Sequence, residues 1–416
     1  MNHFIVGNGP AGVIAAETIR KRDPRATVRL LGDEPSAPYS RMAIPYLLMG
    51  RIDEAGTHLR KDPRHFERLG IESLTGRAKT ADLMQGVVTL EDGRHLPFDR
   101  LLLATGSRPL APSFPGADLP GVHPCWTLED ARNIRRLARP GARVVQIGAG
   151  FIGCIILEAL ASMGVELVVV EMGDRMVPRM MTPAAGGLIK RWCESKGVKV
   201  HTSSKVAGIV ARATGTLEVT LGGGERLEAE LVIVATGVRP NVDLARAMAL
   251  KTDVGVRVDD GMRTSHPAVF AAGDVAQAEE LYTGRFIVNA IQPGAAEQAR
   301  IAAINMAGGN ARSNGSLAIN VLDTLGLIAA SFGQWQGVAG GDRVEEVDAA
   351  HYRYICLQFD RETRLVGATT LGLTEQVGVL RGLIEGRRPL GPWAARLRQN
   401  PMDIMRAYLA TSQAAA

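Results

Sequence analysis

Three glycines near the N-terminus have the spacing of a phosphate-binding turn. The apolar run 4–6 leads into Gly7, Gly9 and Gly12, and helix-forming residues follow at once. In a strand–turn–helix unit, the first glycine allows the tight turn and the second lets the backbone approach a pyrophosphate. The third lets the helix lie close to the strand, so that its free N–H groups face the phosphates. The pattern predicts a dinucleotide site, although such turns are common when they occur alone.

The same pattern occurs again in the middle of the chain. The apolar run 143–147 leads into Gly148, Gly150 and Gly153, and a second run of helix-forming residues follows. In both copies the order is strand, glycine motif, helix, strand with an acidic end, meander, strand and Ala-Thr-Gly-x-Arg-Pro. A repeat of this complexity predicts two homologous dinucleotide-binding domains.

Acidic residues stand at the ends of the strands that follow the two helices. Asp33 and Glu34 lie about 20 positions after the first motif, where a carboxylate binds a ribose 2′-hydroxyl. Glu171 has the same place in the second copy, and it favours NAD over NADP because a carboxylate repels a 2′-phosphate. Arg175 follows four residues later and would soften that repulsion.

Length, composition and charge indicate which broad class of protein this chain belongs to. A chain of 416 residues predicts two or three domains, and 46% hydrophobic with 22% charged residues is typical of a soluble globular protein. The net charge of +5 is modest and aromatic residues are few, which argues against nucleic-acid binding. Because we find neither a signal peptide nor an apolar stretch of ~20 residues, we expect no membrane insertion and a cytoplasmic location.

The four cysteines, Cys125, Cys154, Cys193 and Cys356, lie far apart and show neither a CxxC motif nor a metal-binding spacing. They are expected to be buried thiols in a reducing compartment, and no metal site is predicted.

The order of five motifs resembles a known family. They are GNGPAG (7–12), ATGSRP (104–109), GAGFIG (148–153), ATGVRP (235–240) and AAGDVA (271–276). In this order the whole chain resembles the class I pyridine nucleotide-disulfide oxidoreductases, which are flavoproteins with two dinucleotide-binding domains. The resemblance implies an α/β fold with two Rossmann-like, glutathione-reductase-like domains and a small α+β C-terminal interface domain. It also implies FAD on the first domain and NAD(H), in preference to NADP(H), on the second.

The resemblance further implies that the FAD domain is split in sequence. We expect its first part at 1–112, the NAD(P) domain at 113–240, the second FAD part at 241–312 and the interface domain at 313–416. The family's third domain often supports dimers, so the resemblance also admits a homodimer.

Site residues carried over from the family fall into two sets. FAD would be held by Gly7, Gly9, Pro10, Ala11, Gly12, Asp33, Glu34, Arg41, Ala78, Ala104, Thr105, Gly106, Arg108, Gly273, Asp274, Ala290, Ile291 and Gln292. The nicotinamide cofactor would be held by Gly148, Gly150, Phe151, Ile152, Gly153, Glu171, Arg175 and Gly237. By this match the Asp274 carboxylate hydrogen-bonds the ribityl chain, and residues 290–292 lie beside the isoalloxazine ring.

The finer resemblance is to members that reduce a separate carrier protein: rubredoxin and ferredoxin reductases, apoptosis-inducing-factor-like proteins and the flavin module of nitrite reductase large subunits. The disulfide reductases and peroxidases of the family carry a redox cysteine after the first acidic strand end, and segment 39–50 has none. Disulfide or peroxide reduction by that route is therefore not expected. We expect hydride transfer from NADH to the flavin, then electron transfer to an iron–sulfur, haem or other metalloprotein, and we assign no catalytic side chain.

Two departures from the family pattern leave alternative functions open. Relatives usually carry a glutamate at the position of Ile155, and many pair it with a lysine at the position of Tyr46. Either an uncharged pair has replaced an ionic one without loss of hydride transfer, or the donor site has changed. In the second case the chain would take electrons from a partner metalloenzyme and reduce NAD+; a third alternative is an FAD-bearing redox sensor with little turnover. Glu158, one turn further along the helix, is not assumed to substitute, and 397–409 is expected to be a packing helix or dimer contact.

Overall fold

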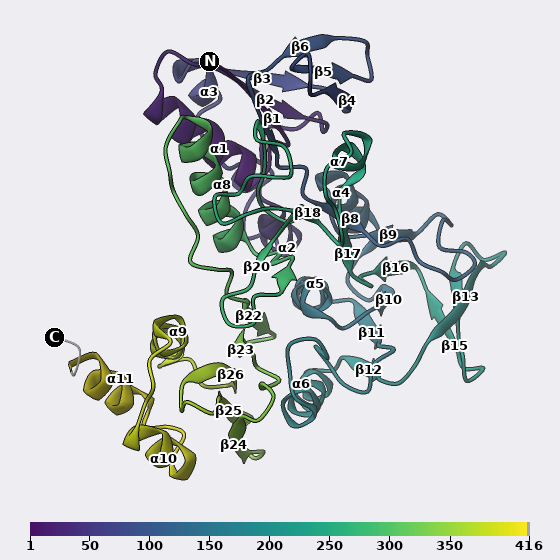
Figure 1. Cartoon of the computed structure of the whole chain (residues 1–416). Coiled ribbons are helices and arrows are strands. Elements are labelled where there is room, and N and C mark those ends of the chain that lie inside the picture. The colour runs from purple at the N-terminus through teal and green to yellow at the C-terminus, as the bar shows by residue number, and fades with distance from the viewer. Residues whose placement is uncertain (414–416) are drawn as a thin grey trace. The chain divides into compact units, whose positions relative to one another are not determined.

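The computed structural model describes residues 1–413, and contacts between residues divide the chain into two compact units (Figure 1). Unit 1 comprises residues 1–47, 52–108 and 238–316, and unit 2 comprises residues 48–51, 109–237 and, of the described residues, 317–413. Each unit is described by itself.

A parallel five-stranded sheet forms the centre of unit 1, in the order β19-β7-β1-β2-β3. Its strands are β1 (Asn2–Val6), β2 (Thr27–Gly32), β3 (Ile71–Thr75), β7 (Arg100–Leu103) and β19 (Val269–Ala271). Phe4, Leu101 and Phe270 come from distant parts of the chain and are all buried in one core. Helices α1 (Pro10–Arg22) and α8 (Gln292–Met306) pack against each other (Figure 1). The three sequence segments of unit 1 therefore share one sheet and one core.

Smaller elements complete unit 1. A meander of β4 (Ala78–Asp82), β5 (Val87–Leu90) and β6 (His95–Pro97) is antiparallel, as the sequence predicts. The remaining strands are β8 (Ser107–Pro109), β17 (Val238–Pro240), β18 (Val256–Arg257), β20 (Ala276–Glu279) and β21 (Phe286–Ile287). The remaining helices are η1 (Arg41–Ala43), α2 (Ile44–Leu48), η2 (Ala55–Thr57), α3 (His65–Arg68) and α7 (Asp243–Ala247).

Unit 2 contains a second parallel five-stranded sheet, in the order β12-β11-β10-β16-β9. Its strands are β9 (Val122–Pro124), β10 (Arg143–Ile147), β11 (Glu166–Val170), β12 (Lys199–His201) and β16 (Leu231–Val234). Its helices are α4 (Leu128–Leu137), α5 (Phe151–Ser162) and α6 (Pro183–Ser195), and its meander is β13 (Val206–Ala211), β14 (Leu217–Leu221) and β15 (Arg226–Ala229). The predicted α/β fold with two Rossmann-like parts is confirmed.

The C-terminal part of unit 2 is an antiparallel sheet followed by helices. The strands, in the order β22-β23-β26-β25-β24, are β22 (Ile319–Thr324), β23 (Leu327–Gly333), β24 (Asp342–Asp348), β25 (Arg353–Phe359) and β26 (Leu365–Leu371). Helices α9 (Val377–Gly386), α10 (Pro392–Gln399) and α11 (Ile404–Gln413) follow. The prediction of a single helix at 397–409 is wrong, because α10 ends at Gln399 and α11 begins at Ile404. The helix is interrupted at Asn400, which precedes Pro401, and the residue before a proline disfavours helical backbone.

Side-chain contacts join this C-terminal sheet to residues 109–237. The Trp192 indole N–H on α6 lies within hydrogen-bonding distance of the carbonyl oxygens of Thr324 (3.1 Å) and Leu325 (3.2 Å). The Thr182 hydroxyl donates to the Tyr354 hydroxyl at 2.7 Å. These contacts help to group the two parts as one unit; the sequence boundaries at 112, 240 and 312 stay predictions.

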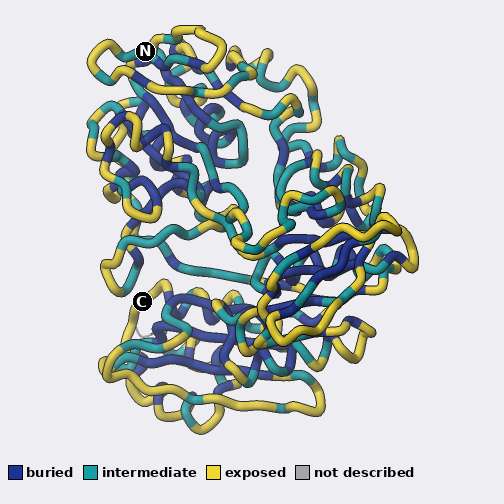
Figure 2. Tube along the Cα trace, turned by 90° about the vertical axis from the view of Figure 1, so that its right-hand side faces the viewer, coloured by how far each residue is buried: buried dark blue, intermediate teal, exposed yellow. Residues whose placement is uncertain are grey.

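Buried segments run through the interior of each unit, and exposed segments follow its loops (Figure 2). Over residues 1–413, no helix is both long enough and apolar enough to cross a membrane.

Candidate functional site

The glycine turn of unit 1 has the geometry that its spacing predicts. Gly7 has a φ of +111°, and a side chain there would collide with the carbonyl oxygen of Ala104. A side chain at Gly12 would collide with the carbonyl oxygen of Gly7, so only glycine lets α1 lie this close to the turn. Among the described residues, no heavy atom outside its chain neighbours lies within 4 Å of where a Cβ of Gly9 would be. The turn therefore leaves open space at the N-terminus of α1, where a pyrophosphate fits.

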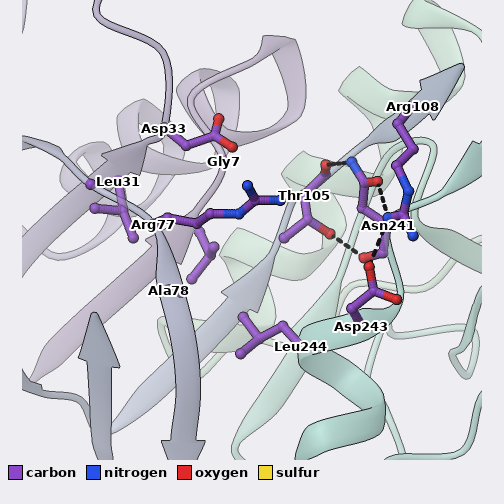
Figure 3. Close-up of a pocket in the computed structure, with 12 residues that line it drawn as sticks. Gly7, Leu31, Asp33, Arg77, Ala78, Thr105, Arg108, Asn241, Asp243 and Leu244 are labelled. Carbon is purple, nitrogen blue, oxygen red and sulfur yellow. Dashed lines mark hydrogen bonds and ion pairs between the residues drawn. The ribbon is translucent and has the colours of Figure 1, made fainter. Parts of the chain in front are cut away.

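A pocket beside this turn collects residues from all three segments of unit 1 (Figure 3). It is lined by Val6, Gly7, Leu31, Asp33, Gly76, Arg77, Ala78, Thr105, Arg108, Asn241, Asp243 and Leu244. Five of the expected FAD contacts are among them: Gly7, Asp33, Ala78, Thr105 and Arg108. Its backbone edges, aliphatic side chains and one strand-end carboxylate fit the adenosine half of a dinucleotide.

Glu34 and Arg41, also expected at the cofactor, do not line this pocket. Glu34 instead accepts hydrogen bonds from the Tyr39 hydroxyl at 2.6 Å and from the Arg41 guanidinium at 2.8 Å. Of the two adjacent acids, Asp33 is therefore the one that the structure directs to the pocket.

Sequence reasoning missed Asn241, which links segments 52–108 and 238–316 of unit 1 beside the pocket (Figure 3). Its side-chain amide donates to the carbonyl of Thr105, and the Thr105 hydroxyl donates to the carbonyl of Asn241, both at 2.8 Å. The Arg108 guanidinium donates to Asn241 Oδ1 at 2.6 Å and to the Asp243 carboxylate at 2.8 Å. The position of Asn241 in the sequence could have indicated this role, because Asn241 directly follows the second Ala-Thr-Gly-x-Arg-Pro motif, where the chain returns to unit 1.

Asp274 follows β19 and is half-buried. Its carboxylate accepts a hydrogen bond from the Ser107 hydroxyl at 2.7 Å. Burial raises the pKa of Asp274 above its ordinary value, and the Ser107 hydrogen bond opposes that rise. The preceding residue, Gly273, donates its N–H to Gln298 Oε1 on α8 at 2.9 Å. A half-buried carboxylate acceptor of this kind suits a hydroxyl-bearing chain such as the ribityl group.

Ala290, Ile291 and Gln292 lead into α8, whose N-cap is Ile291. Gln292 Oε1 accepts a hydrogen bond from the Ser40 hydroxyl at 2.9 Å. This contact ties the start of α8 to the loop that follows β2.

The glycine turn of unit 2 repeats this geometry. Gly148 has a φ of +105°, and a side chain there would collide with the carbonyl oxygen of Ala235. Within residues 1–413, the Cβ position at Gly150 is as open as that at Gly9. Gly237 has a φ of +116°, and its carbonyl accepts from the Leu110 N–H at 2.9 Å.

Glu171 and Arg175 have different surroundings at the end of β11. The buried Glu171 carboxylate accepts from the backbone N–H groups of Ala149 and Gly173, each at 2.7 Å. Arg175 donates to the carbonyls of Met181 and Pro178 and to the Asp174 carboxylate. The Arg175 guanidinium is therefore used within its own loop, while a carboxylate stays at the strand end and disfavours a 2′-phosphate.

Tyr46 and Ile155, the two positions that depart from the family pattern, have different exposures. Tyr46 on α2 exposes 49% of its surface, and Ile155 on α5 is half-buried. Burial and the nearby Asp323 carboxylate raise the pKa of Glu158, which accepts a hydrogen bond from the backbone of Leu325. Glu158 thus belongs to the contact with the C-terminal sheet and does not take the place of Ile155.

All four cysteines are free and buried. Burial raises the pKa of the Cys125 and Cys193 thiols to about 12, and raises the pKa of Cys154 and Cys356. Because the thiolate is the reactive form, burial disfavours reaction at these thiols.

Comparison with known proteins decides the family. Residues 1–303 match the family described as pyridine nucleotide-disulphide oxidoreductase. The chain belongs to this family. It is an oxidoreductase, and its cofactors are FAD and NAD(H), as predicted.

Two curated relatives have informative names. The NADH-dependent phenylglyoxylate dehydrogenase subunit epsilon of Aromatoleum evansii is 30% identical over 97% of this chain and 96% of its own. Rubredoxin-NAD(+) reductase of Pseudomonas putida is 33% identical over 73% of this chain and 79% of its own.

Two solved structures share the whole fold. Putidaredoxin reductase, in its covalent complex with putidaredoxin, is 26% identical with a TM-score of 0.90 over 98% of both chains. A NAD-dependent persulfide reductase from A. fulgidus is 30% identical with a TM-score of 0.87, over 94% of this chain and 78% of that one.

Proposed function

We propose that this flavoprotein passes electrons between NADH and a separate redox carrier protein, without a thiol relay. The observation that carries this proposal is the presence of two open glycine turns, one in each unit, in a chain whose four thiols are buried. Two nucleotide cofactors can exchange a hydride directly, and electrons that leave the flavin need another acceptor. Relatives named as rubredoxin and ferredoxin reductases support a carrier protein as that acceptor.

In unit 1, the proposed FAD contacts run along the sheet edge. The N–H groups at the start of α1 face the pyrophosphate, and the Asp33 carboxylate accepts from the adenosine ribose. Asp274 accepts from the ribityl chain, while residues 290–292 approach the ring. FAD would supply the chemistry, because a flavin can accept one hydride and release its two electrons one at a time. The protein binds, orients and shields it.

In unit 2, the proposed NADH contacts are the turn 148–153 and Glu171. We leave Arg175 out of this set because its donors are used within its own loop. Neither Ile155 nor Tyr46 supplies the charge that relatives carry there. Binding of the nicotinamide therefore relies on positioning by the turn and the strand end rather than on an ion pair.

A second candidate function is reverse electron flow, from a partner metalloenzyme through the flavin to NAD+. The observation that favours it is the end-to-end match to a protein named as one subunit of a dehydrogenase. The carrier, a homodimer and a cytoplasmic location stay predictions.

An anaerobic titration separates these functions. NADH, then NADPH, is added to the FAD-loaded protein while the flavin absorption band is followed. Bleaching by NADH, with turnover when rubredoxin or a [2Fe–2S] ferredoxin is added, supports the first candidate. Resistance to NADH, with dithionite-reduced protein reoxidised by NAD+, supports the second. Reduction by NADH without turnover with any carrier would contradict both and leave the sensor alternative.

A further inference from the structure

We propose that Gln146 is a positioning residue for the nicotinamide cofactor, because its buried amide holds the glycine turn of unit 2 in its binding shape. The inference rests on the proposed function in one respect only, namely that NADH binds at residues 148–153.

Gln146 lies on β10, directly below the turn, and is completely buried. Its Nε2 donates to the carbonyl oxygens of Gly148 and Gly153, each at 2.9 Å. One side chain thus ties the first and third glycines of the motif together. Its Oε1 is buried with no hydrogen-bond partner in the part of the chain that the structure describes. A buried unpartnered oxygen costs stability, so this amide is not explained as a simple core residue.

The peptide group between Gly148 and Ala149 is held at both ends. Its carbonyl accepts from Gln146, and its N–H donates to Glu171 Oε2 at 2.7 Å. A trans peptide is planar, so fixing its two polar atoms on opposite sides fixes its orientation. Without these bonds the peptide would be free to rotate, because Gly148 has no side chain to restrict its backbone.

The next peptide group is held as well. The carbonyl of Ala149 accepts from the N–H of Val177 at 2.8 Å. Val177 has a φ of +49°, a conformation that β-branched residues avoid. Because this carbonyl faces Val177, the N–H of Gly150 on the same planar peptide faces the other way. That N–H and those of the first turn of α5 are the donors available to a pyrophosphate.

Unit 1 has no equivalent of the Gln146 bonds. The N–H of Gly7 donates to the carbonyl of Leu31, and the N–H of Gly148 donates to the carbonyl of Val170, so the two turns have the same register. In this register Ile5 corresponds to Gln146 and Gly32 to Glu171, and neither Ile5 nor Gly32 has a hydrogen-bonding side chain.

The difference matches how the two cofactors are used. FAD stays bound through turnover, whereas the nicotinamide cofactor binds and leaves in every cycle. A turn that must accept its ligand repeatedly gains affinity from being ordered beforehand.

The test is Gln146→Met, which keeps the size of the side chain and removes its hydrogen bonds. Stopped-flow reduction of the flavin at increasing NADH concentration separates the Kd for NADH from the limiting rate. We expect the Kd to rise roughly tenfold, because the variant loses both hydrogen bonds that order the turn, with the limiting rate unchanged. FAD content should not change. The exchange of the Ala149 N–H with deuterium should become faster.

Gln358→Met is the matched control, because Gln358 is a buried amide in the same unit and donates to the carbonyl of Trp335 at 3.0 Å. It should leave the Kd for NADH unchanged. An unchanged Kd in Gln146→Met, or an equal rise in both variants, would overturn the inference. Failure of NADH to reduce the wild-type flavin would overturn the proposed function instead. In that case exchange at Ala149 in the cofactor-free protein still decides whether Gln146 orders the turn.

Discussion

Glu171 Oε2 lies 2.7 Å from the backbone nitrogen of Ala149, inside the glycine turn of unit 2. Its other oxygen, Oε1, lies 2.7 Å from the backbone nitrogen of Gly173. The carboxylate therefore joins the end of β11 to the turn. Each carboxylate oxygen has a second lone pair, so the same group is still able to accept from a ribose hydroxyl.

The charge of Glu171 should set the preference for NADH. Glu171→Gln keeps an acceptor for one backbone N–H and removes the charge that repels a 2′-phosphate. We expect the ratio of the NADPH and NADH dissociation constants to fall about tenfold, the size of one moderately screened charge interaction. Flavin reduction by each nucleotide measures both constants. Asp174→Asn, which removes an exposed neighbouring charge paired with Arg175, is the control and should shift the ratio less.

Asn241 should govern how firmly unit 1 holds FAD. Asn241→Ala breaks the side-chain bonds to Thr105 and Arg108 and frees two groups that line the pocket. We expect the Kd for FAD to rise about tenfold, because ordered pocket residues cost less to organise on binding. Fluorescence titration of the deflavinated protein measures this constant. Asn241→Asp keeps the acceptor for Arg108 and should show a smaller effect; equal affinity in all three proteins would contradict this role.

The parts of the site that repeat in sequence were predictable from it. Gly7 and Gly148 have the positive φ values that their motifs require, and Asp33 lies in the pocket as its distance from the first motif predicts. These positions are set by local backbone geometry. A strand, a turn and a helix close together in sequence have few ways to pack, so their residues identify them.

The parts that depend on side-chain partners were not predictable. The sequence places Arg175 near Glu171 but does not show that its guanidinium is taken up by the carbonyls of Met181 and Pro178. It also does not show that Gln146, an isolated polar residue in an apolar strand, bonds the two ends of a motif. Such roles depend on the orientation of a side chain within the fold, and a local sequence pattern does not predict that orientation.

His3 should make the protein sensitive to acid. It is 1% exposed, and burial lowers its pKa from 6.5 to about 4, so it is neutral in the folded protein at pH 5. In the unfolded chain it binds a proton below pH 6.5, so stability is present above that pH and is lost as the pH falls toward 4. We expect the unfolding free energy of wild type, relative to that of His3→Leu, to fall by about 2 kcal/mol between pH 7 and pH 5. Urea unfolding at both values measures it, and an equal pH dependence in wild type and His3→Leu would contradict this role of His3.

Tyr354 should stabilise the contact between the C-terminal sheet and α6 without affecting cofactor binding. Its hydroxyl accepts from Thr182 at 2.7 Å and donates to Glu345 Oε1 at 2.8 Å, and Thr182 is the N-cap of α6. Tyr354→Phe keeps the ring and removes both bonds, which leaves the buried Thr182 hydroxyl without this partner. We expect a loss of about 1–3 kcal/mol in the free energy of unfolding, the usual cost of unpairing a buried polar group. Urea unfolding measures that loss. The α6 helix and the strands of the C-terminal sheet meet through side chains rather than through a shared strand. We therefore expect unit 2 to unfold at a lower urea concentration. The FAD content of the native protein should not change.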